Sequence, residues 1–270
     1  MIKSSANKKT DLIGPDPLPK FYAGTSGLVL PVPNKQHYPP EFREGSRLSY
    51  YASLCNSIEI NSSFYKIPLK KTTASWEASV PENFSFSFKI YKEISHKKEL
   101  EFDESMLARF MDSISGINVK KGALLLQLPP GTALLRKQLQ KLLKKIIKED
   151  PQRSWKLNVE FRNPSWYTKE IFSLLTDLQV GLVIHDIPKS ITPSLEPWTD
   201  FVYLRFHGVA GDYRGSYNIE QLEPYSKNVH VWLKNNKTVF VYFNNTIGEA
   251  FSNLQSFRIL VESSALKVKS

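Results

Sequence analysis

The amino-acid sequence predicts an α/β protein with the fold of a single (β/α)8 TIM-like barrel. Two observations lead to this fold class: eight short apolar runs that are typical of strands, and helical periodicity between most of them. A length of 270 residues also fits one such barrel, which usually takes about 250 residues. The alternative is an open, doubly wound parallel sheet, which the same alternation of elements permits.

The predicted strands are rich in Val, Ile, Leu and aromatic residues, which favours strands buried in a sheet. They are 21–26, 57–61, 84–90, 122–128, 155–161, 180–185, 201–207 and 238–244.

Local signals support the helices between these strands. Asp103 precedes an apolar-periodic stretch and is expected to cap it, and Ser165 or Thr168 is expected to cap the helix after the fifth strand. In 134–148, Leu and Ile recur at helical spacing, so the lysines of this segment are expected on the solvent side. The stretch 188–200 is Pro-rich, which predicts a loop.

The barrel is expected to span 21–260, with a flexible lead-in over 1–20 and a C-terminal tail over 261–270. No apolar run reaches the 18 or so residues that cross a bilayer, and the lead-in lacks the apolar stretch of a secretory signal. Cys55 is the only cysteine, which excludes an intrachain disulfide. We therefore expect a cytoplasmic protein without a membrane partner.

Side chains on a strand alternate between two faces, so the apolar face is expected to contact the helices and the other face to line the barrel interior. In the fifth strand Val159 points outward, which leaves Glu160 and Arg162 inside. The sixth strand is ambiguous, because either His185 or Asp186 faces the interior. The polar side chains predicted to point inward are Glu59, Asn61, Lys89, Gln127, Glu160, Arg162, Arg205, His207 and Asn244.

These inward side chains fall near the carboxyl ends of their strands, where barrels of this type have their active sites. Buried charges must be paired or must serve a ligand, so the sequence predicts a ligand site at this rim. The catalytic candidates are Glu59, Glu160, His207 and Asp186. The carboxylates would act as general acid and base, because burial and neighbouring cations can separate their pKa values.

The binding candidates fall into three chemical groups. Lys89, Arg162 and Arg205 would form a clamp for an anion, because guanidinium matches carboxylate and phosphate. Amide side chains would orient hydroxyl or carbonyl groups, and aromatic rings on the loops would stack on a sugar or base. The amides are Asn61, Gln127 and Asn244, and the rings are those of Tyr65, Trp166, Tyr213 and Tyr217.

The main functional hypothesis is an enzyme that acts by acid/base chemistry on a small anionic, hydroxyl-rich molecule, with hydrolase, lyase and isomerase reactions all open. A Schiff base at Lys89 is a further alternative. No cofactor is expected: Glu59, Glu160, Asp186 and His207 would offer ligands to a divalent metal, but HxH and HExxH spacings are absent and nearby cations would repel it.

The second hypothesis is a non-catalytic protein that binds nucleic acid or a phosphorylated ligand. A net charge of +10, from 36 basic and 26 acidic residues, favours a polyanionic partner. Carboxylates inside the barrel would repel phosphates, so this hypothesis ranks behind the enzyme.

Short motifs along residues 21 to about 258 resemble the DUF72 family, also called YecE-like proteins. They include GTSG (24–27), EINSSFY (59–65), FK (88–89), SH (95–96), QLPP (127–130), VEFRNPSW (159–166), YLRFHG (203–208), GSY (215–217) and YFNN (242–245). The resemblance implies a TIM-barrel fold, it does not imply a particular activity, and it adds His96 to the substrate-binding candidates. Two positions depart from the family pattern: Leu28 replaces a tryptophan, and His185 replaces a hydrophobic residue, which favours Asp186 as the site residue.

Overall fold

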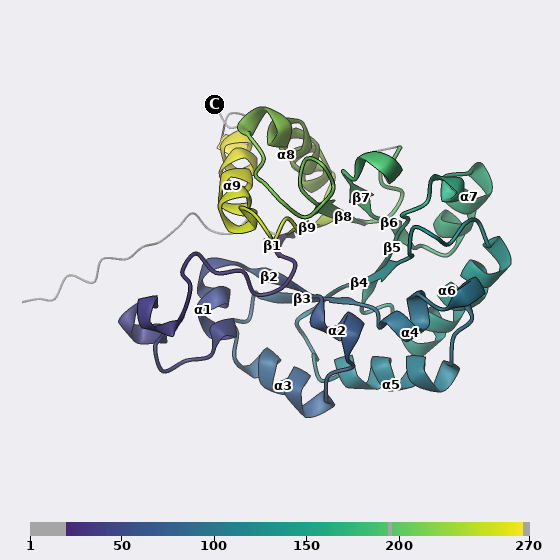
Figure 1. The fold of residues 1–270 in the computed structure, drawn as a ribbon, viewed down its shortest axis with the longest axis horizontal. Coiled ribbons are helices and arrows are strands. Elements are labelled where there is room, and N and C mark those ends of the chain that lie inside the picture. Colours follow the sequence, from purple (N-terminus) through teal and green to yellow (C-terminus); the bar gives the residue numbers. More distant parts are fainter. Residues whose placement is uncertain (1–19, 194–195, 267–270) are drawn as a thin grey trace, which may run out of the picture.

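The computed structural model describes residues 20–193 and 196–266, and every strand pairing in it is parallel. Figure 1 shows the strands in the middle of the molecule with helices around them. The strands are β1 (Phe21–Thr25), β2 (Ser57–Ile60), β3 (Ser85–Lys89), β4 (Lys121–Gln127), β5 (Lys156–Glu160), β6 (Gly181–Leu182), β7 (Ile184–His185), β8 (Phe201–Phe206) and β9 (Thr238–Phe243).

The strands form two parallel sheets, so the expected α/β class is confirmed but a closed barrel is not. One sheet has the order β2-β3-β4-β5-β6 and the other the order β1-β9-β8-β7. Neighbouring strands in these sheets are consecutive in the chain, except that the first strand, β1, lies beside the last, β9. A barrel would have the same order of neighbours. The ladders stop at two seams, between β1 and β2 and between β6 and β7.

At the first seam, side chains take the bonds that a continuous ladder would make. Tyr51 OH accepts from Thr25 N at 2.8 Å and donates to Ser57 O at 3.0 Å. The side chain of Asn56 also bonds the backbone of β1, because its Oδ1 accepts from Ala23 N and its Nδ2 donates to Phe21 O. Just after β1 ends, Ser26 forms an isolated parallel bridge with Glu59 of β2.

At the second seam, the predicted strand 180–185 is divided into β6 and β7 on either side of Val183. The hydroxyl of Thr192, from the Pro-rich loop, donates to Val183 O at 2.9 Å and accepts from His185 N at 3.1 Å. A loop side chain therefore bonds this part of the strand where a neighbouring strand would in an unbroken ladder.

The helices lie on the outside of the strands (Figure 1). They are α1 (Arg47–Leu54), α2 (Ser62–Tyr65), α3 (Lys70–Ala78), α4 (Lys92–Ser95), α5 (Glu104–Ile114), α6 (Arg136–Glu149), α7 (Lys169–Asp177), α8 (Ile219–Lys234) and α9 (Ala250–Leu266). Asp103 caps α5 as predicted, by accepting from Ser105 N at 2.8 Å. Thr168, rather than Ser165, caps α7.

Two apolar clusters confirm the predicted alternation of the strands. The larger lies between strands and helices and includes Val159, Leu204 and Val241. The smaller is formed by side chains of the opposite parity, which fill the interior: Ala123, Leu125, Val183, Phe201, Tyr203, Phe240 and Tyr242. The polar side chains of the predicted site follow this smaller cluster toward the carboxyl ends of the strands.

The predicted lead-in lies outside the described residues except for Lys20, and so does the end of the predicted tail, 267–270. Part of that tail is helical, because α9 continues to Leu266. In the described ranges, no helix is both long and apolar enough to span a bilayer.

Candidate functional site

Glu59, Arg205 and Glu160 form a fully buried ion-pair chain, which we call the buried ionic layer. Arg205 Nη2 lies 2.8 Å from Glu59 Oε1, and Arg205 Nη1 lies 2.6 Å from Glu160 Oε2. Glu59 comes from β2, Glu160 from β5 and Arg205 from β8, so this layer joins the two sheets. A guanidinium between two carboxylates can donate hydrogen bonds to both of them without water.

Hydroxyl groups complete the environment of Glu59. Ser26 Oγ donates to Glu59 Oε1 at 2.6 Å, and Tyr203 OH donates to Glu59 Oε2 at 2.5 Å. Both oxygens of this carboxylate therefore have protein donors, and the side chain has no contact with solvent.

Glu160 is held in its ionised form. Its Oε1 accepts a hydrogen bond from Arg162 Nε, and its Oε2 accepts from Arg205. Burial by itself raises the pKa of Glu160, but the charges of Arg162 and Arg205 outweigh burial and hold that pKa well below its ordinary value. A carboxylate in this state is a poor proton donor at neutral pH.

His207 lies between Arg162 and Asp186. Arg162 Nη2 lies 3.0 Å from His207 Nε2, and His207 Nδ1 lies 3.4 Å from Asp186 Oδ1. Burial holds the pKa of His207 well below its ordinary value, so the imidazole is neutral. Nε2 then accepts from Arg162, and the ring proton is on Nδ1, toward Asp186.

Asp186 is a carboxyl group that can change its protonation near neutral pH. Burial raises its pKa to about 6, although hydrogen bonds from Tyr217 OH and His207 N oppose the shift. Its side chain is 11% exposed, in contrast to the fully buried Glu59 and Glu160. Asp186 is therefore better placed than either glutamate to exchange a proton.

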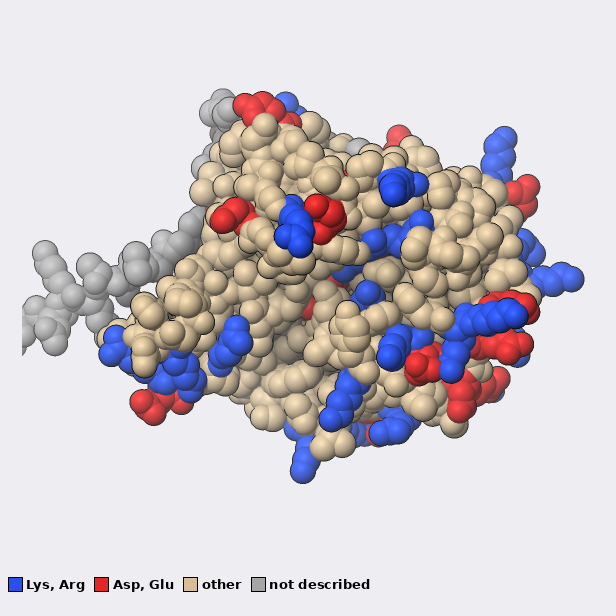
Figure 2. All heavy atoms as spheres, in the orientation of Figure 1, with Lys and Arg blue, Asp and Glu red and all other residues tan. Residues whose placement is uncertain are grey.

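Several polar side chains above the buried ionic layer remain partly exposed, and we call them the open layer: Asn61, Lys89, His96, Gln127, Arg162 and Asp186. Figure 2 shows a hollow near the middle of one face of the molecule, with basic and acidic atoms visible inside it. Within the open layer, Arg162 Nη2 donates to Gln127 Oε1 at 3.2 Å.

Lys89 and His96 pack around the ring of Phe64. Lys89 Nζ lies 4.1 Å from the ring centroid, and the His96 ring is edge-on to it at 4.8 Å. Burial, with Arg205 and Arg162 nearby, lowers the pKa of Lys89 to about 8. Burial and the charge of Lys89 lower the pKa of His96 to about 4, so His96 is neutral.

The family described as "Protein of unknown function DUF72" matches residues 22–269. The chain belongs to the DUF72 family. It is similar to UPF0759 protein YunF of Bacillus subtilis (strain 168), with 27% identity over 243 residues that cover 78% of this chain and 84% of that protein. UPF0759 protein YecE of Escherichia coli (strain K12) is 29% identical over 103 residues, 38% of each chain.

Solved structures of DUF72 family proteins share this fold. One from Enterococcus faecalis V583 aligns with a TM-score of 0.73 at 26% identity and covers 90% of this chain and 97% of its own. One from Thermotoga maritima MSB8 aligns with a TM-score of 0.74 at 24% identity and covers 90% and 99%. The description of the DUF72 family names no function, and the solved structures show that its members share this mixed α/β fold.

The DUF72 motifs supply most of the two layers. EINSSFY provides Glu59, Asn61 and Phe64, and VEFRNPSW provides Glu160 and Arg162. Leu28, where the family pattern has tryptophan, packs against the outer apolar cluster.

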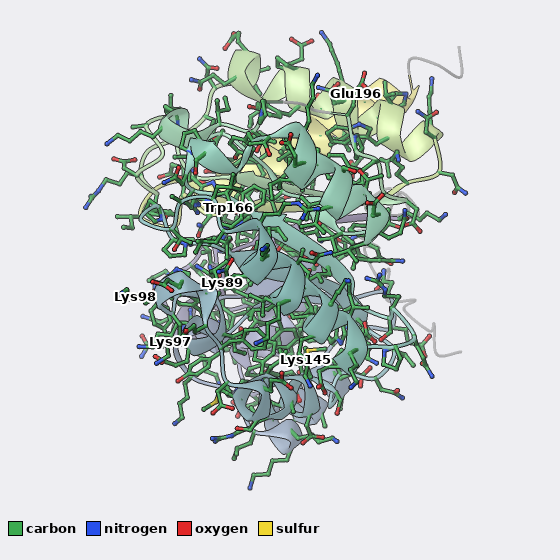
Figure 3. All side chains as sticks on the ribbon, turned by 90° about the vertical axis from the view of Figure 1, so that its right-hand side faces the viewer. Lys89, Lys97, Lys98, Lys145, Trp166 and Glu196 are labelled. Atoms are coloured by element: carbon green, nitrogen blue, oxygen red, sulfur yellow. The ribbon has the colours of Figure 1, made fainter. Side chains whose placement is uncertain are left out.

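Other predicted site residues have different positions from those expected. Arg205 is enclosed by two carboxylates, so it is not an open part of an anion clamp. Trp166 is buried against Phe161 and donates to Thr132 O, because the turn after β5 folds its ring into the core (Figure 3). Tyr217 is also buried, and its hydroxyl bonds Asp186.

The remaining predicted aromatic and amide residues differ in how close they lie to the site. Tyr65 is 70% exposed and contacts Phe64 edge-on. Tyr213 does reach the site, since its hydroxyl accepts from Arg162 Nη1 at 3.3 Å. Asn244, which was predicted to orient a ligand, is buried, with 8% of its surface exposed.

Both candidates from the sixth strand lie beside His207. His185 Nε2 lies 3.0 Å from Phe161 O, and its ring is 5.8 Å from that of His207. Asp186 Oδ1 accepts a hydrogen bond from His207 N at 2.9 Å.

The sequence did not predict three of the contacts in the site. Ser26 and Tyr203 donate hydrogen bonds to Glu59, and the ring of Phe64 contacts the ammonium group of Lys89. In residues 20–193 and 196–266, no three His, Cys, Asp or Glu side chains form a metal-binding group. The four residues considered as metal ligands are tied instead to Arg205, Arg162, Tyr203 and Tyr217.

Proposed function

We propose that this DUF72 protein is an enzyme that binds a small anionic, hydroxyl-rich molecule in the open layer and transforms it by acid/base chemistry. The observation that carries the proposal is the contrast between the two layers. Beneath, Glu59, Arg205 and Glu160 are fully buried and ion-paired with one another, and Glu160 is also paired with Arg162. Above, cations and a titrating carboxyl group are partly exposed at the carboxyl ends of the strands, the usual place for catalysis in such folds.

In this proposal Lys89 and Arg162 attract the anionic group of the substrate. Gln127 and Asn61 orient its hydroxyl groups. Asn61 Oδ1 is buried and accepts no hydrogen bond from the described residues, so it is available to a ligand hydroxyl.

Asp186 exchanges the proton in this mechanism, because a pKa of about 6 populates both of its forms near neutral pH. Glu160 stays ionised and fixes the positions of Arg162 and Arg205. This assignment moves the catalytic role from Glu59 and Glu160 to Asp186, with His207 in contact with it. A single carboxyl group that transfers a proton can serve a hydrolase, a lyase or an isomerase reaction.

Calorimetric titration with ribose 5-phosphate, ribose and inorganic phosphate tests the binding half of the proposal. Ribose 5-phosphate is expected to bind more tightly than ribose, and Arg162→Met is expected to weaken its binding about tenfold or more, since one charge-assisted hydrogen bond contributes about 1.5 to 3 kcal/mol. Lys66→Met serves as the control, because Lys66 is exposed and lies outside the open layer.

Absence of phosphate and ribose 5-phosphate binding at low salt would contradict an anion site. For any sugar phosphate that is turned over, Asp186→Asn is expected to lower kcat by about a hundredfold or more while leaving binding in place, as the loss of a general acid/base does. Unchanged turnover in that variant would remove Asp186 from the mechanism.

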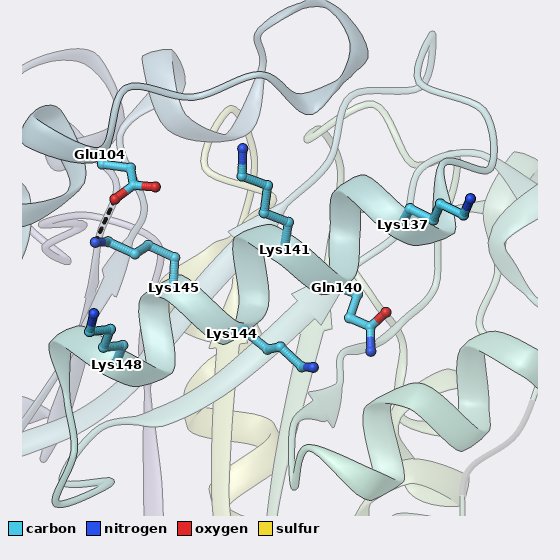
Figure 4. A pocket seen from close by; sticks show the side chains of 7 residues that line it. All are labelled: Glu104, Lys137, Gln140, Lys141, Lys144, Lys145 and Lys148. Atoms are coloured by element: carbon cyan, nitrogen blue, oxygen red, sulfur yellow. Dashed lines mark ion pairs between the residues drawn. The ribbon is translucent and has the colours of Figure 1, made fainter.

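A second candidate function, binding of nucleic acid, is favoured by one surface away from the rim. The exposed side of α6 forms a groove of about 440 Å³ lined by lysines (Figure 4). Lys145 is paired with Glu104 at 2.6 Å, whereas within the described chain no ion pair involves Lys141 or Lys144. Such a row of cations suits a polyanion.

Fluorescence titration with single-stranded RNA at several salt concentrations tests this second function. Replacing Lys141, Lys144 and Lys148 by Gln is expected to reduce the slope of log K against log salt by about 2, at roughly 0.7 per phosphate contact. The matched control replaces the exposed Lys66, Lys71 and Lys234 by Gln. Equal effects of the two triple variants would mean that α6 is only a solvated helix face.

Three structural expectations also stand as proposals. We propose that the two sheets act as one barrel and that residues 21–260 form one domain, which the shared interior supports. We also propose a cytoplasmic location, which the single, buried Cys55 supports.

A further inference from the structure

Lys89 differs from the other cations of the site in having no carboxylate partner. In the described ranges, ion pairs join Arg162 to Glu160 and Arg205 to both glutamates, and none involves Lys89. Its ammonium group contacts the ring of Phe64 instead, at 4.1 Å from the centroid. Figure 3 shows Lys89 set within the molecule, whereas Lys97 and Lys98 lie toward its edge.

This environment raises the fraction of Lys89 that is present as the neutral amine. Partial burial and the nearby charges of Arg205 and Arg162 lower the pKa of Lys89 to about 8. About a tenth of the side chains are then uncharged at pH 7, compared with well under a thousandth for a lysine with the ordinary pKa of about 10.4. An amine in a desolvated place beside other cations is the form in which lysine acts as a nucleophile toward carbonyl groups.

We propose that Lys89 forms a Schiff base with a small carbonyl compound that carries an anionic group. The proposal rests on the proposed function in one respect, since the anionic group would be bound by Arg162 of the open layer. The position agrees with such a role: Lys89 ends β3, its side chain faces the interior, and the neutral His96 packs on the same ring of Phe64.

The reaction balances without an oxidant or a cofactor. The lone pair of Nζ attacks the carbonyl carbon, and the carbonyl oxygen takes a proton to give a carbinolamine. Loss of water then forms the carbon–nitrogen double bond. Overall, one ammonium group and one carbonyl give one iminium ion and one water molecule, so the positive charge is kept on nitrogen, where it can withdraw electrons from the neighbouring carbon.

Reductive trapping tests the proposal on the full chain. The protein is incubated with glyoxylate, pyruvate or the neutral ketone acetone, each with sodium cyanoborohydride, and the products are located by intact mass and peptide mapping. The hydride reduces the iminium ion to a stable secondary amine. We expect one adduct per chain at Lys89, formed at least tenfold faster with the two anions than with acetone.

Two variants and a pH series sharpen this test. Lys89→Arg is expected to abolish the adduct while keeping the positive charge, and Lys98→Arg, a change at an exposed lysine, is expected to leave it unchanged. The rate of trapping is expected to level off above about pH 8, where Lys89 loses its proton. A rate that keeps rising toward pH 10, or label spread evenly over surface lysines, would overturn the proposal.

The outcome is separable from that of the proposed function. If phosphate binds and Lys89 is not labelled, the Schiff base is excluded and the anion site stands. If Lys89 is labelled at equal rates by pyruvate and acetone, the amine is reactive but the recognition of an anion is excluded.

Discussion

At the scale of single residues, burial and pairing decide which ionisable groups of the interior keep their charge. Glu160 stays ionised because Arg162 and Arg205 hold its pKa well below its ordinary value. Asp186 has hydroxyl and amide donors instead of a guanidinium, and burial raises its pKa to about 6. Of these two carboxyl groups, the one that can change its protonation near neutral pH is therefore the one without an arginine partner.

Asp186 is expected to make stability depend on pH in a defined window. Its pKa is about 6 in the folded protein, above its ordinary value of 3.8, so the folded state binds more protons than the unfolded state between these values. The contribution of Asp186 to stability therefore falls as pH rises from about 4 to about 6. Urea unfolding of the wild type and Asp186→Asn at pH 4, 5, 6 and 7 measures this.

The free energy of unfolding of the wild type, relative to the variant, is expected to decrease across that window by up to about 3 kcal/mol, at 1.36 kcal/mol per pKa unit. Other groups titrate in both proteins and cancel in the difference. A difference that does not vary with pH would show that burial leaves this carboxyl group unperturbed.

Arg205 is expected to be the most sensitive position of the interior. Arg205→Met removes the cation between Glu59 and Glu160 and leaves buried carboxylates short of a partner, which costs about 3 to 5 kcal/mol in the free energy of unfolding. Chemical denaturation measures the loss. Adding Glu160→Gln to this variant is expected to recover part of it, because one buried charge disappears.

The control for Arg205 is an exposed ion pair. Lys70 lies 2.7 Å from Asp112, with 55% and 67% of the two side chains exposed. Lys70→Met is expected to change stability little, since solvent screens such pairs. Similar losses at Lys70 and Arg205 would contradict the role of burial.

At the scale of elements, side chains rather than a continuous ladder connect the ends of the two sheets. β1 and β2 approach so closely that a Cβ on Gly24 would lie 2.0 Å from Ser57 O. The Tyr51 hydroxyl lies at this seam and serves both Thr25 and Ser57. Helix α1 therefore contributes to the sheet through one side chain as well as by packing.

Tyr51→Phe is expected to weaken this seam. The change keeps the ring but leaves Thr25 N and Ser57 O without a partner, and a buried unsatisfied group costs about 1 to 3 kcal/mol. Thermal and urea unfolding measure the effect. Tyr65→Phe, at a 70% exposed ring, is the matched control and is expected to be neutral. Equal stability of the two variants would show that the seam does not depend on the hydroxyl.

At the scale of the whole molecule, the interior joins both sheets. Tyr242 of β9 bonds Ser57 of β2 at 2.6 Å and Ser87 of β3 at 2.8 Å. Above these bonds, Arg205 of β8 pairs with glutamates of β2 and β5. Polar contacts at two levels therefore cross between the sheets, in addition to the inner apolar cluster.

The two sheets are consequently expected to unfold together. Hydrogen exchange of amides in β4 and in β8, followed at increasing urea, is expected to converge on one free energy of unfolding and one dependence on denaturant. These strands belong to different sheets, so they report on each separately. Two separate values would mean that the chain consists of two independent units.

The sequence predicted much of this arrangement because the relevant signals are local. The period of a strand decides which face of it is apolar, and this placed Glu59, Lys89, Glu160 and Arg205 inside. Helix caps such as Asp103 were also readable, because cap and helix are neighbours in the chain. The motifs gave the DUF72 family for the same reason.

The sequence by itself determined the parallel α/β class, the inward polar residues and the end of the strands at which they gather. Only the tertiary structure decided that Arg205 lies between two glutamates, that Trp166 is buried in the core and that Tyr51 and Thr192 interrupt the ladders. Each of these depends on how strands and loops far apart in the chain are set against one another. Periodicity fixes the direction of a side chain, whereas its partners depend on the packing of the whole fold.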